Sequence, residues 1–178
     1  MKEATAYKIV AGMFGASSLA ILIKVLVDHP SEQVVGERFV TSQLILPTPI
    51  YVFHFKPITL FMAFGFLWWI LGMEGFKEEI KRVFPKQLRR IIFVGFVFSA
   101  FIMGYEALHN FLLWMSFYTI YQGNLDLLYH QVNPAMPKPV NFNFISKLFS
   151  MFFAGALYGA YFFHKLIEEE PFLKETKR

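Results

Sequence analysis

The sequence predicts an all-α integral membrane protein: a bundle of four transmembrane helices with both termini in the cytoplasm and two long extracytoplasmic loops. Of its 178 residues, 56% are hydrophobic and 19% aromatic, whereas a soluble domain averages about 45–50% apolar residues. The apolar residues lie in long blocks separated by charged or proline-rich stretches, as helices that cross a bilayer require. The whole chain, 1–178, is predicted to be one membrane domain.

The first span is predicted at about 7–27. Lys8 and Lys24 bracket an uninterrupted apolar stretch, and about 20 residues at about 1.5 Å per residue cross a hydrocarbon core of about 30 Å. The basic start and the small residues at 15–18 are also compatible with a signal peptide, and the sequence leaves that alternative open.

The first outer loop is predicted at about 28–56. Residues 39–46 and 50–55 are rich in β-branched and aromatic side chains, and Pro47-Thr48-Pro49 separates them. This pattern predicts two extended segments around a proline turn, forming a short β-hairpin over the membrane surface.

The second span is predicted at about 57–73, with Pro57 in its first turn. Residues 76–85 follow with a helical apolar face, which predicts either a short amphipathic helix in the membrane interface or a solvated extension of the second span.

The third span, at about 91–118, is longer than a bilayer needs, so it tilts or projects beyond the surface. The second outer loop is predicted at about 119–144, where 125–131 could form a single helical turn. The fourth span follows at about 145–167.

Lysine and arginine orient the helices. The N-terminus, the connection between spans two and three, and the C-terminal tail carry twelve of them, and the opposite side carries five. The positive-inside rule therefore places both termini in the cytoplasm of a multi-pass plasma-membrane protein.

Several classes of protein are excluded by composition. The chain has no cysteine, which excludes disulfides, thiolate metal sites and cysteine nucleophiles. Its net charge of +4 is small and dispersed, so no nucleic-acid partner is predicted. Phosphate-binding glycine loops and hydrolase motifs are also absent from the sequence.

Three spans carry small residues at four-residue steps, a pattern typical of close helix packing in lipid. These residues are Gly12, Ala16 and Ala20 in span one, Gly95 and Ser99 in span three, and Gly155 and Gly159 in span four. They predict packing within the bundle, or a contact with another subunit.

Two ionisable residues lie at membrane depth, Lys24 in span one and Glu106 in span three. Such groups are costly in lipid and require a partner or a function. The sequence predicts an ion pair between them, with Asp28 as a competing partner for Lys24, or a proton path through Glu106.

Histidines and carboxylates gather toward the outer mouth of the predicted bundle. Imidazole and carboxylate ligands suit copper, zinc or non-haem iron, and two facing histidines suit a b-type haem. The candidate ligands are His29, His54, Glu106, His109, Asp126 and His130. Glu106 and His109 also form half of a di-iron motif, but the sequence has no second copy. The alternative is that each histidine makes only local hydrogen bonds.

The sequence therefore favours a non-catalytic accessory or structural subunit of a larger membrane complex, such as a respiratory or redox assembly. Its partners would be membrane lipid and other membrane subunits, with no cofactor. The alternative is an oxidoreductase subunit that holds a metal or haem at the outer mouth. An ion or small-molecule transporter that uses Glu106 is a third hypothesis.

Overall fold

The computed structural model describes residues 2–27, 38–40, 43–47, 52–124 and 139–169. The described residues form four long helices, each long and apolar enough to cross a membrane. These helices are α1 (Lys2–Val27), α3 (Pro57–Gly75), α5 (Lys86–Ile120) and α7 (Pro139–Glu168). A short helix, α4 (Lys77–Val83), and two strands, β1 (Leu44–Pro47) and β2 (Val52–Phe55), complete the fold. The prediction of an all-α bundle of four long apolar helices, each a candidate membrane span, is confirmed.

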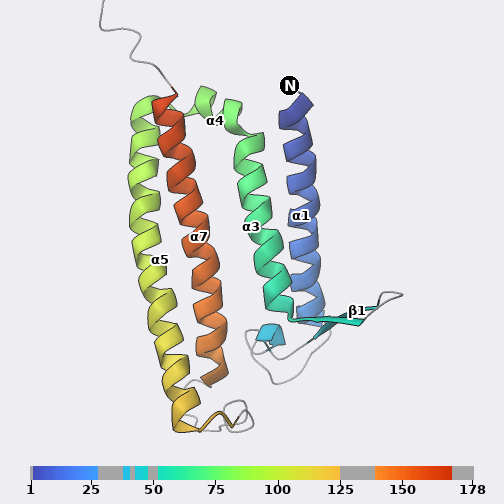
Figure 1. Cartoon of the computed structure of the whole chain (residues 1–178). Helices are drawn as coiled ribbons and strands as arrows, with labels where there is room; N and C mark the ends of the chain where they lie inside the picture. The colour runs from blue at the N-terminus through green and yellow to red at the C-terminus, as the bar shows by residue number, and fades with distance from the viewer. Residues whose placement is uncertain (1, 28–37, 41–42, 48–51, 125–138, 170–178) are drawn as a thin grey trace, which may run out of the picture.

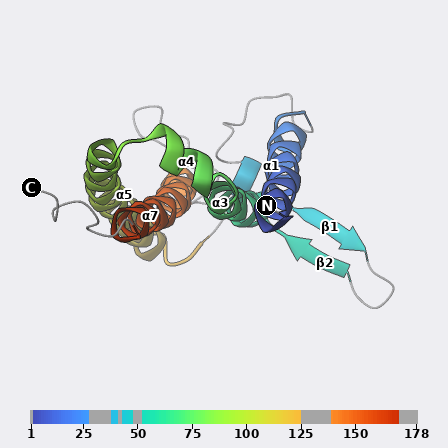
Figure 2. The same cartoon turned by 90° about the horizontal axis from the view of Figure 1, so that it is seen from above.

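The bundle consists of two helix pairs. α1 packs along α3, α5 packs along α7, and the two pairs meet where α3 lies against α7. Seen from above, the long helices follow one another in the order α5, α7, α3, α1 (Figure 2). α1 and α5 therefore lie at opposite ends of a curved row.

The two ends of the bundle differ. The start of α1, the end of α7 and the short helix α4 lie at one end, which we call the α4 end, and the strands lie at the other, the hairpin end (Figure 1). The first and last helices thus begin and end on the same side. That this side is cytoplasmic stays a prediction from the positive charges.

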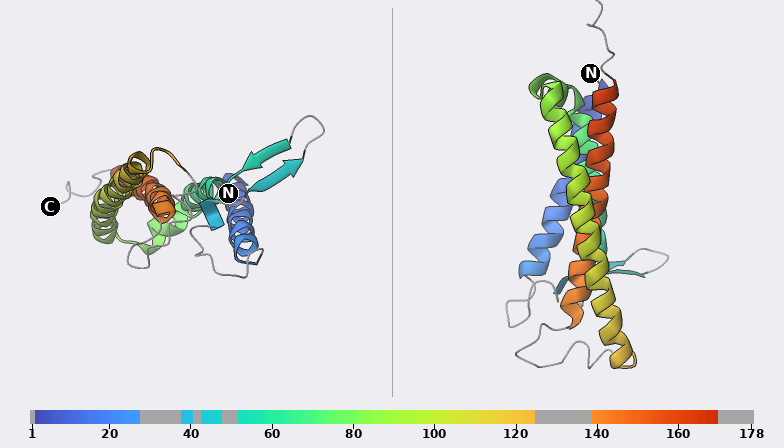
Figure 3. Two further views of the ribbon diagram at one scale, coloured as in Figure 1. Left: turned by 90° about the horizontal axis from the view of Figure 1, so that it is seen from below. Right: turned by 90° about the vertical axis from the view of Figure 1, so that its left-hand side faces the viewer.

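Helix α5 projects beyond the other helices at the hairpin end. Its 35 residues measure about 52 Å at about 1.5 Å per residue, whereas the 19 residues of α3 measure about 28 Å, close to the hydrocarbon thickness. Figures 1 and 3 show the lower part of α5 reaching well past the ends of α1 and α3.

The fourth helix begins at Pro139, six residues before the predicted span, so residues 139–144 of the predicted outer loop are helical. Proline suits the first residue of a helix because its φ angle is already helical and its missing N–H is not needed there. Phe142 also stacks on Phe117 of α5, with ring centroids 5.7 Å apart. This contact continues the packing of α5 on α7 beyond the predicted span.

The strands form an antiparallel hairpin in which Leu44 pairs with Phe55 and Ile45 with His54. Phe39 and Val40, predicted as extended, lie instead in a helical turn at 38–40. This turn buries the Phe39 ring, 2% exposed, against Phe61 of α3 and Phe144 of α7, at centroid distances of 5.3 and 5.8 Å. Burial of the ring explains why the prediction of an extended backbone fails here.

Two apolar clusters close the bundle at its ends. The hairpin-end cluster consists of Ile21, Val25, Phe39 and Ile58. The α4-end cluster consists of Met73, Phe162, Phe163 and Leu166. Between them, the middle of the bundle is less completely filled.

Helix α4 is a separate element and does not continue α3. The chain turns at Phe76, whose φ and ψ are −99° and 11°, and α4 then runs from α3 toward α5 (Figure 2). Ile80 and Phe84 pack against the α4-end cluster, while Phe76 and Val83 are exposed. One side of the α4 segment thus rests on the bundle, as an amphipathic interfacial helix requires.

Candidate functional site

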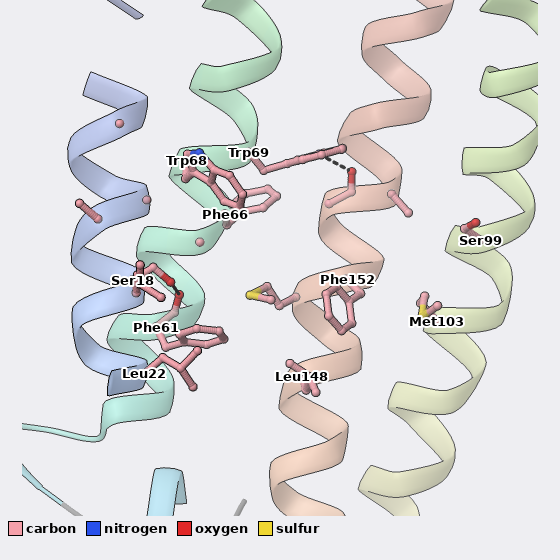
Figure 4. A pocket seen from close by; sticks show the side chains of 18 of the residues that line it. Ser18, Leu22, Phe61, Phe66, Trp68, Trp69, Ser99, Met103, Leu148 and Phe152 are labelled. Atoms are coloured by element: carbon pink, nitrogen blue, oxygen red, sulfur yellow. Dashed lines mark hydrogen bonds between the residues drawn. The ribbon is translucent and has the colours of Figure 1, made fainter. Parts of the chain in front are cut away.

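A cavity of about 920 Å³ lies in the middle of the bundle, between the two apolar clusters. This volume is near the upper end of small-molecule sites, which measure about 300–1,000 Å³. We call it the central cavity. It extends from Gly12 to Leu22 on α1, from Phe61 to Trp69 on α3, from Phe96 to Met103 on α5, and from Leu148 to Ala156 on α7. Figure 4 looks into it, with α1, α3, α7 and α5 from left to right.

The wall of the central cavity is apolar and aromatic. Phe61, Phe66, Trp68, Trp69 and Phe152 contribute rings. None of the lining residues that the structure describes is ionisable. The chemistry of the wall therefore favours an apolar occupant over a charged one.

Two of the four polar side chains of this wall, among the described residues, are bonded within the protein. The Trp69 indole Nε1–H donates to the backbone oxygen of Gly155, 3.0 Å away, and this bond ties α3 to α7 across the cavity (Figure 4). Ser18 Oγ donates to the backbone oxygen of Phe61 at 3.4 Å. Few polar groups are thus left to bind a polar ligand.

Lys24 and Glu106 lie on different helix pairs, Lys24 on α1 and Glu106 on α5. Lys24 lies in the last turn of α1, and α1 and α5 stand at opposite ends of the row (Figure 2). The side chain of Glu106 accepts a hydrogen bond from Asn110 Nδ2 at 3.4 Å, and the same nitrogen donates to the Glu106 backbone oxygen at 2.8 Å. The structure therefore brings Glu106 together with a buried asparagine one turn along its own helix.

The proposed metal ligands are only partly within the described residues. His109 is exposed and its ring stacks on Tyr105, and the backbone of His54 lies in β2. His29, Asp126 and His130 lie outside the described residues, as does the predicted turn at 125–131. Across the described segments, no three histidine, aspartate or glutamate side chains gather closely enough to hold a metal ion.

The small residues of the predicted stripes have different surroundings. A Cβ added to Gly159 would lie 2.7 Å from the ring of Phe96 on α5, and one added to Gly155 would lie 3.8 Å from Trp69 on α3. A Cβ on Gly12 or Gly95 would meet no atom within 4 Å. The glycines of α7 therefore admit aromatic rings from both neighbouring helices.

The remaining small residues of the predicted stripes are less enclosed. Ala16, Ala20 and Ser99 are exposed or half-buried, and Ala16 and Ser99 line the central cavity.

Sequence analysis missed a polar contact inside the bundle near the α4 end. The hydroxyl of Tyr158 on α7 donates to Glu74 on α3 at 2.8 Å. The signal that could have identified the pair is a carboxylate and a phenol at similar depths in two spans that run in the same direction.

Arg89 is a second residue that sequence analysis missed. It is 2% exposed, and its Nη1 donates to the backbone oxygen of Leu166 at 3.1 Å. This oxygen belongs to the last turn of α7, where a cation also interacts favourably with the helix dipole.

Ion pairs hold α4 to the first and last helices. Lys8 of α1 pairs with Glu79. Lys77 and Lys81 of α4 pair with Glu169, just past the end of α7, at 2.6 and 2.5 Å. Hydrogen bonds from these two lysines lower the pKa of Glu169 from 4.5 to about 2, and a hydrogen bond from Lys8 lowers the pKa of Glu79. Both carboxylates are therefore ionised at neutral pH.

No protein-family model matches the chain, and no curated protein or solved structure is significantly similar to it.

Proposed function

We propose that the chain is a non-catalytic accessory subunit of a larger complex in the plasma membrane, with both termini in the cytoplasm. The observation that carries this proposal is the apolar surface on the projecting end of α5. A respiratory or other redox assembly is the kind of complex that we propose.

Helix α5 is too long to lie wholly within the hydrocarbon core of the membrane. Transmembrane helices tilt by at most about 40°, and at that tilt a helix of about 52 Å is still about 40 Å tall. The hydrocarbon core accounts for only about 30 Å of this height. The end of α5 at the hairpin end therefore enters the headgroup region or the water beyond it.

Large apolar side chains continue to this end. Leu112, Met115, Tyr118 and Ile120 are 54%, 40%, 41% and 68% exposed. Large apolar side chains that lie beyond the hydrocarbon core are not covered by lipid chains, and such surface favours a contact with another protein. A partner subunit that spans the same membrane and rises beside α5 would cover this patch.

The test is purification of the tagged full chain from its native source in a mild detergent. We expect partner polypeptides in fixed stoichiometry. The double variant Leu112→Gln/Ile120→Gln should reduce their recovery more than tenfold, because losing about 1 kcal/mol of contact at each of two positions weakens binding by this amount.

The matched control is Leu26→Gln/Val27→Gln at the end of α1. These residues are 44% and 69% exposed and also end a helix on the hairpin side, so the chemical change is nearly the same. The control should retain the partners. Equal recovery from both double variants, or a wild-type chain that purifies alone as a stable monomer, would refute the proposal.

The same preparation tests the oxidoreductase alternative. Elemental analysis and a visible absorption spectrum detect a metal or haem in stoichiometric amount. His109→Ala should remove that signal if the histidine is a ligand.

A further inference from the structure

We propose that the central cavity binds one hydrocarbon chain of a membrane lipid, which enters from the side of the bundle. The site is independent of the partner surface on α5. It rests on the height of the cavity, on its closed ends and on the chemistry of its wall.

The height of the cavity fits a lipid chain and not a transmembrane helix. Along α1 the lining runs from Gly12 to Leu22, which is about 15 Å at about 1.5 Å per residue. This is about half of the hydrocarbon core of about 30 Å, and so about the depth of one leaflet. A partner helix that crosses the membrane would need a groove of twice this height.

The ends of the cavity are closed. Leu22 and Phe61, which line it, already pack against the hairpin-end cluster. Phe96, which lines it on α5, packs against the α4-end cluster. Packed apolar side chains therefore lie between the cavity and each end of the bundle.

The side of the cavity is open. Leu19 on α1, Trp68 on α3 and Phe152 on α7 line the cavity and are also exposed. In a bilayer, the opening at this depth faces the hydrocarbon chains of the surrounding lipid.

The wall suits a flexible chain. It carries no ionisable group among the described residues, and the Trp69 indole is already bonded to Gly155. Met103 and Met151 also line the cavity, and methionine adapts its shape to irregular apolar partners. Because the bilayer interior is as apolar as the cavity, retention depends on close packing around the chain.

The test uses the purified full chain in detergent and phosphatidylcholine that carries bromine atoms in the middle of its acyl chain. Bromine quenches nearby indole fluorescence. The chain has three tryptophans, so Trp114→Phe leaves only Trp68 and Trp69, which both line the cavity. We expect quenching that saturates at about one lipid per protein.

A variant that fills the cavity should abolish this saturable quenching. Gly12 lines the cavity, and a Cβ added to it meets no atom within 4 Å, so Gly12→Phe places a ring in open space. Gly95 is equally open but is not part of the wall, so Gly95→Phe is the matched control and should bind as the parent does. Ala16→Phe, one turn further along α1, fills the same space if Gly12→Phe fails to fold.

Two results would overturn the inference. One is quenching that rises in proportion to added lipid without saturation, or that is the same in the filled and control variants. The other is a photo-crosslinking residue at Phe152 that attaches, in native membranes, to a polypeptide and not to lipid. The second result would assign the cavity to a partner helix.

Discussion

The contact between Gly159 and Phe96 gives the sharpest test of how the helices pack. In Gly159→Ala, the new Cβ would lie 2.7 Å from Cδ1 and Cε1 of Phe96 and 2.9 Å from Cγ. The ring cannot move away freely, because it packs edge-on to Trp69 and stacks on Phe163. We therefore expect α5 and α7 to be forced apart or the ring to leave its position.

The expected change in the free energy of unfolding of Gly159→Ala follows from two opposing effects. Replacing glycine by alanine inside a helix stabilises it by about 1 kcal/mol, and overpacking a filled contact costs about 1–3 kcal/mol. In Gly95→Ala only the first effect operates, because a Cβ there meets no atom within 4 Å. Gly159→Ala should therefore be about 1–3 kcal/mol less stable than Gly95→Ala.

The assay is reversible unfolding of the purified protein in mixed detergent micelles, followed by circular dichroism. The double variant Gly159→Ala/Phe96→Leu should recover part of the loss, since a smaller side chain faces the new methyl group. The double-mutant cycle separates this coupling from the cost of losing the ring. Equal stability of Gly159→Ala and Gly95→Ala would refute the packing of α7 on α5 described above.

Three further changes probe the polar contacts, each by the same unfolding measurement. Trp69→Phe removes the donor to Gly155 and should lower the free energy of unfolding by about 0.5–1.5 kcal/mol; no change would mean that the bond does not join the helix pairs. Tyr158→Phe removes the donor to Glu74 and should cost about 1–3 kcal/mol because the half-buried carboxylate loses its partner, whereas a neutral result would contradict the contact. The pKa of Glu169 is lowered to about 2, so its pairs with two lysines stabilise the fold above about pH 4.5 and are lost as the pH falls toward 2. These exposed pairs are worth at most about 1 kcal/mol, and Glu169→Gln should remove that pH dependence.

The spans could be predicted from the sequence because hydropathy and proline positions determine them locally. Pro57 and Gly75 begin and end α3 close to the predicted bounds. The start of α7 at Pro139 was missed because residues 139–144 are less apolar, and they are helical because they extend the packing on α5.

The arrangement of the helices could not be predicted in the same way. In a membrane, the faces that contact lipid and the faces that contact helices are both apolar, so periodicity does not separate them. Phe96 and Phe98 look alike in the sequence, yet Phe96 contacts Gly159 and Phe98 is exposed. The central cavity depends on which face of each of the four helices turns inward, and no sequence pattern marks those faces.

The pairing of α1 with α3 and of α5 with α7 bears on how the chain is made. Each pair is a hairpin of successive spans, so α1 and α3 can associate in the membrane while the ribosome is still synthesising α5. Local contacts of this kind form quickly because little chain entropy is lost in closing them. We then expect α3 to dock on α7 last. The central cavity lies between the helix pair that is synthesised first and the pair that is synthesised second.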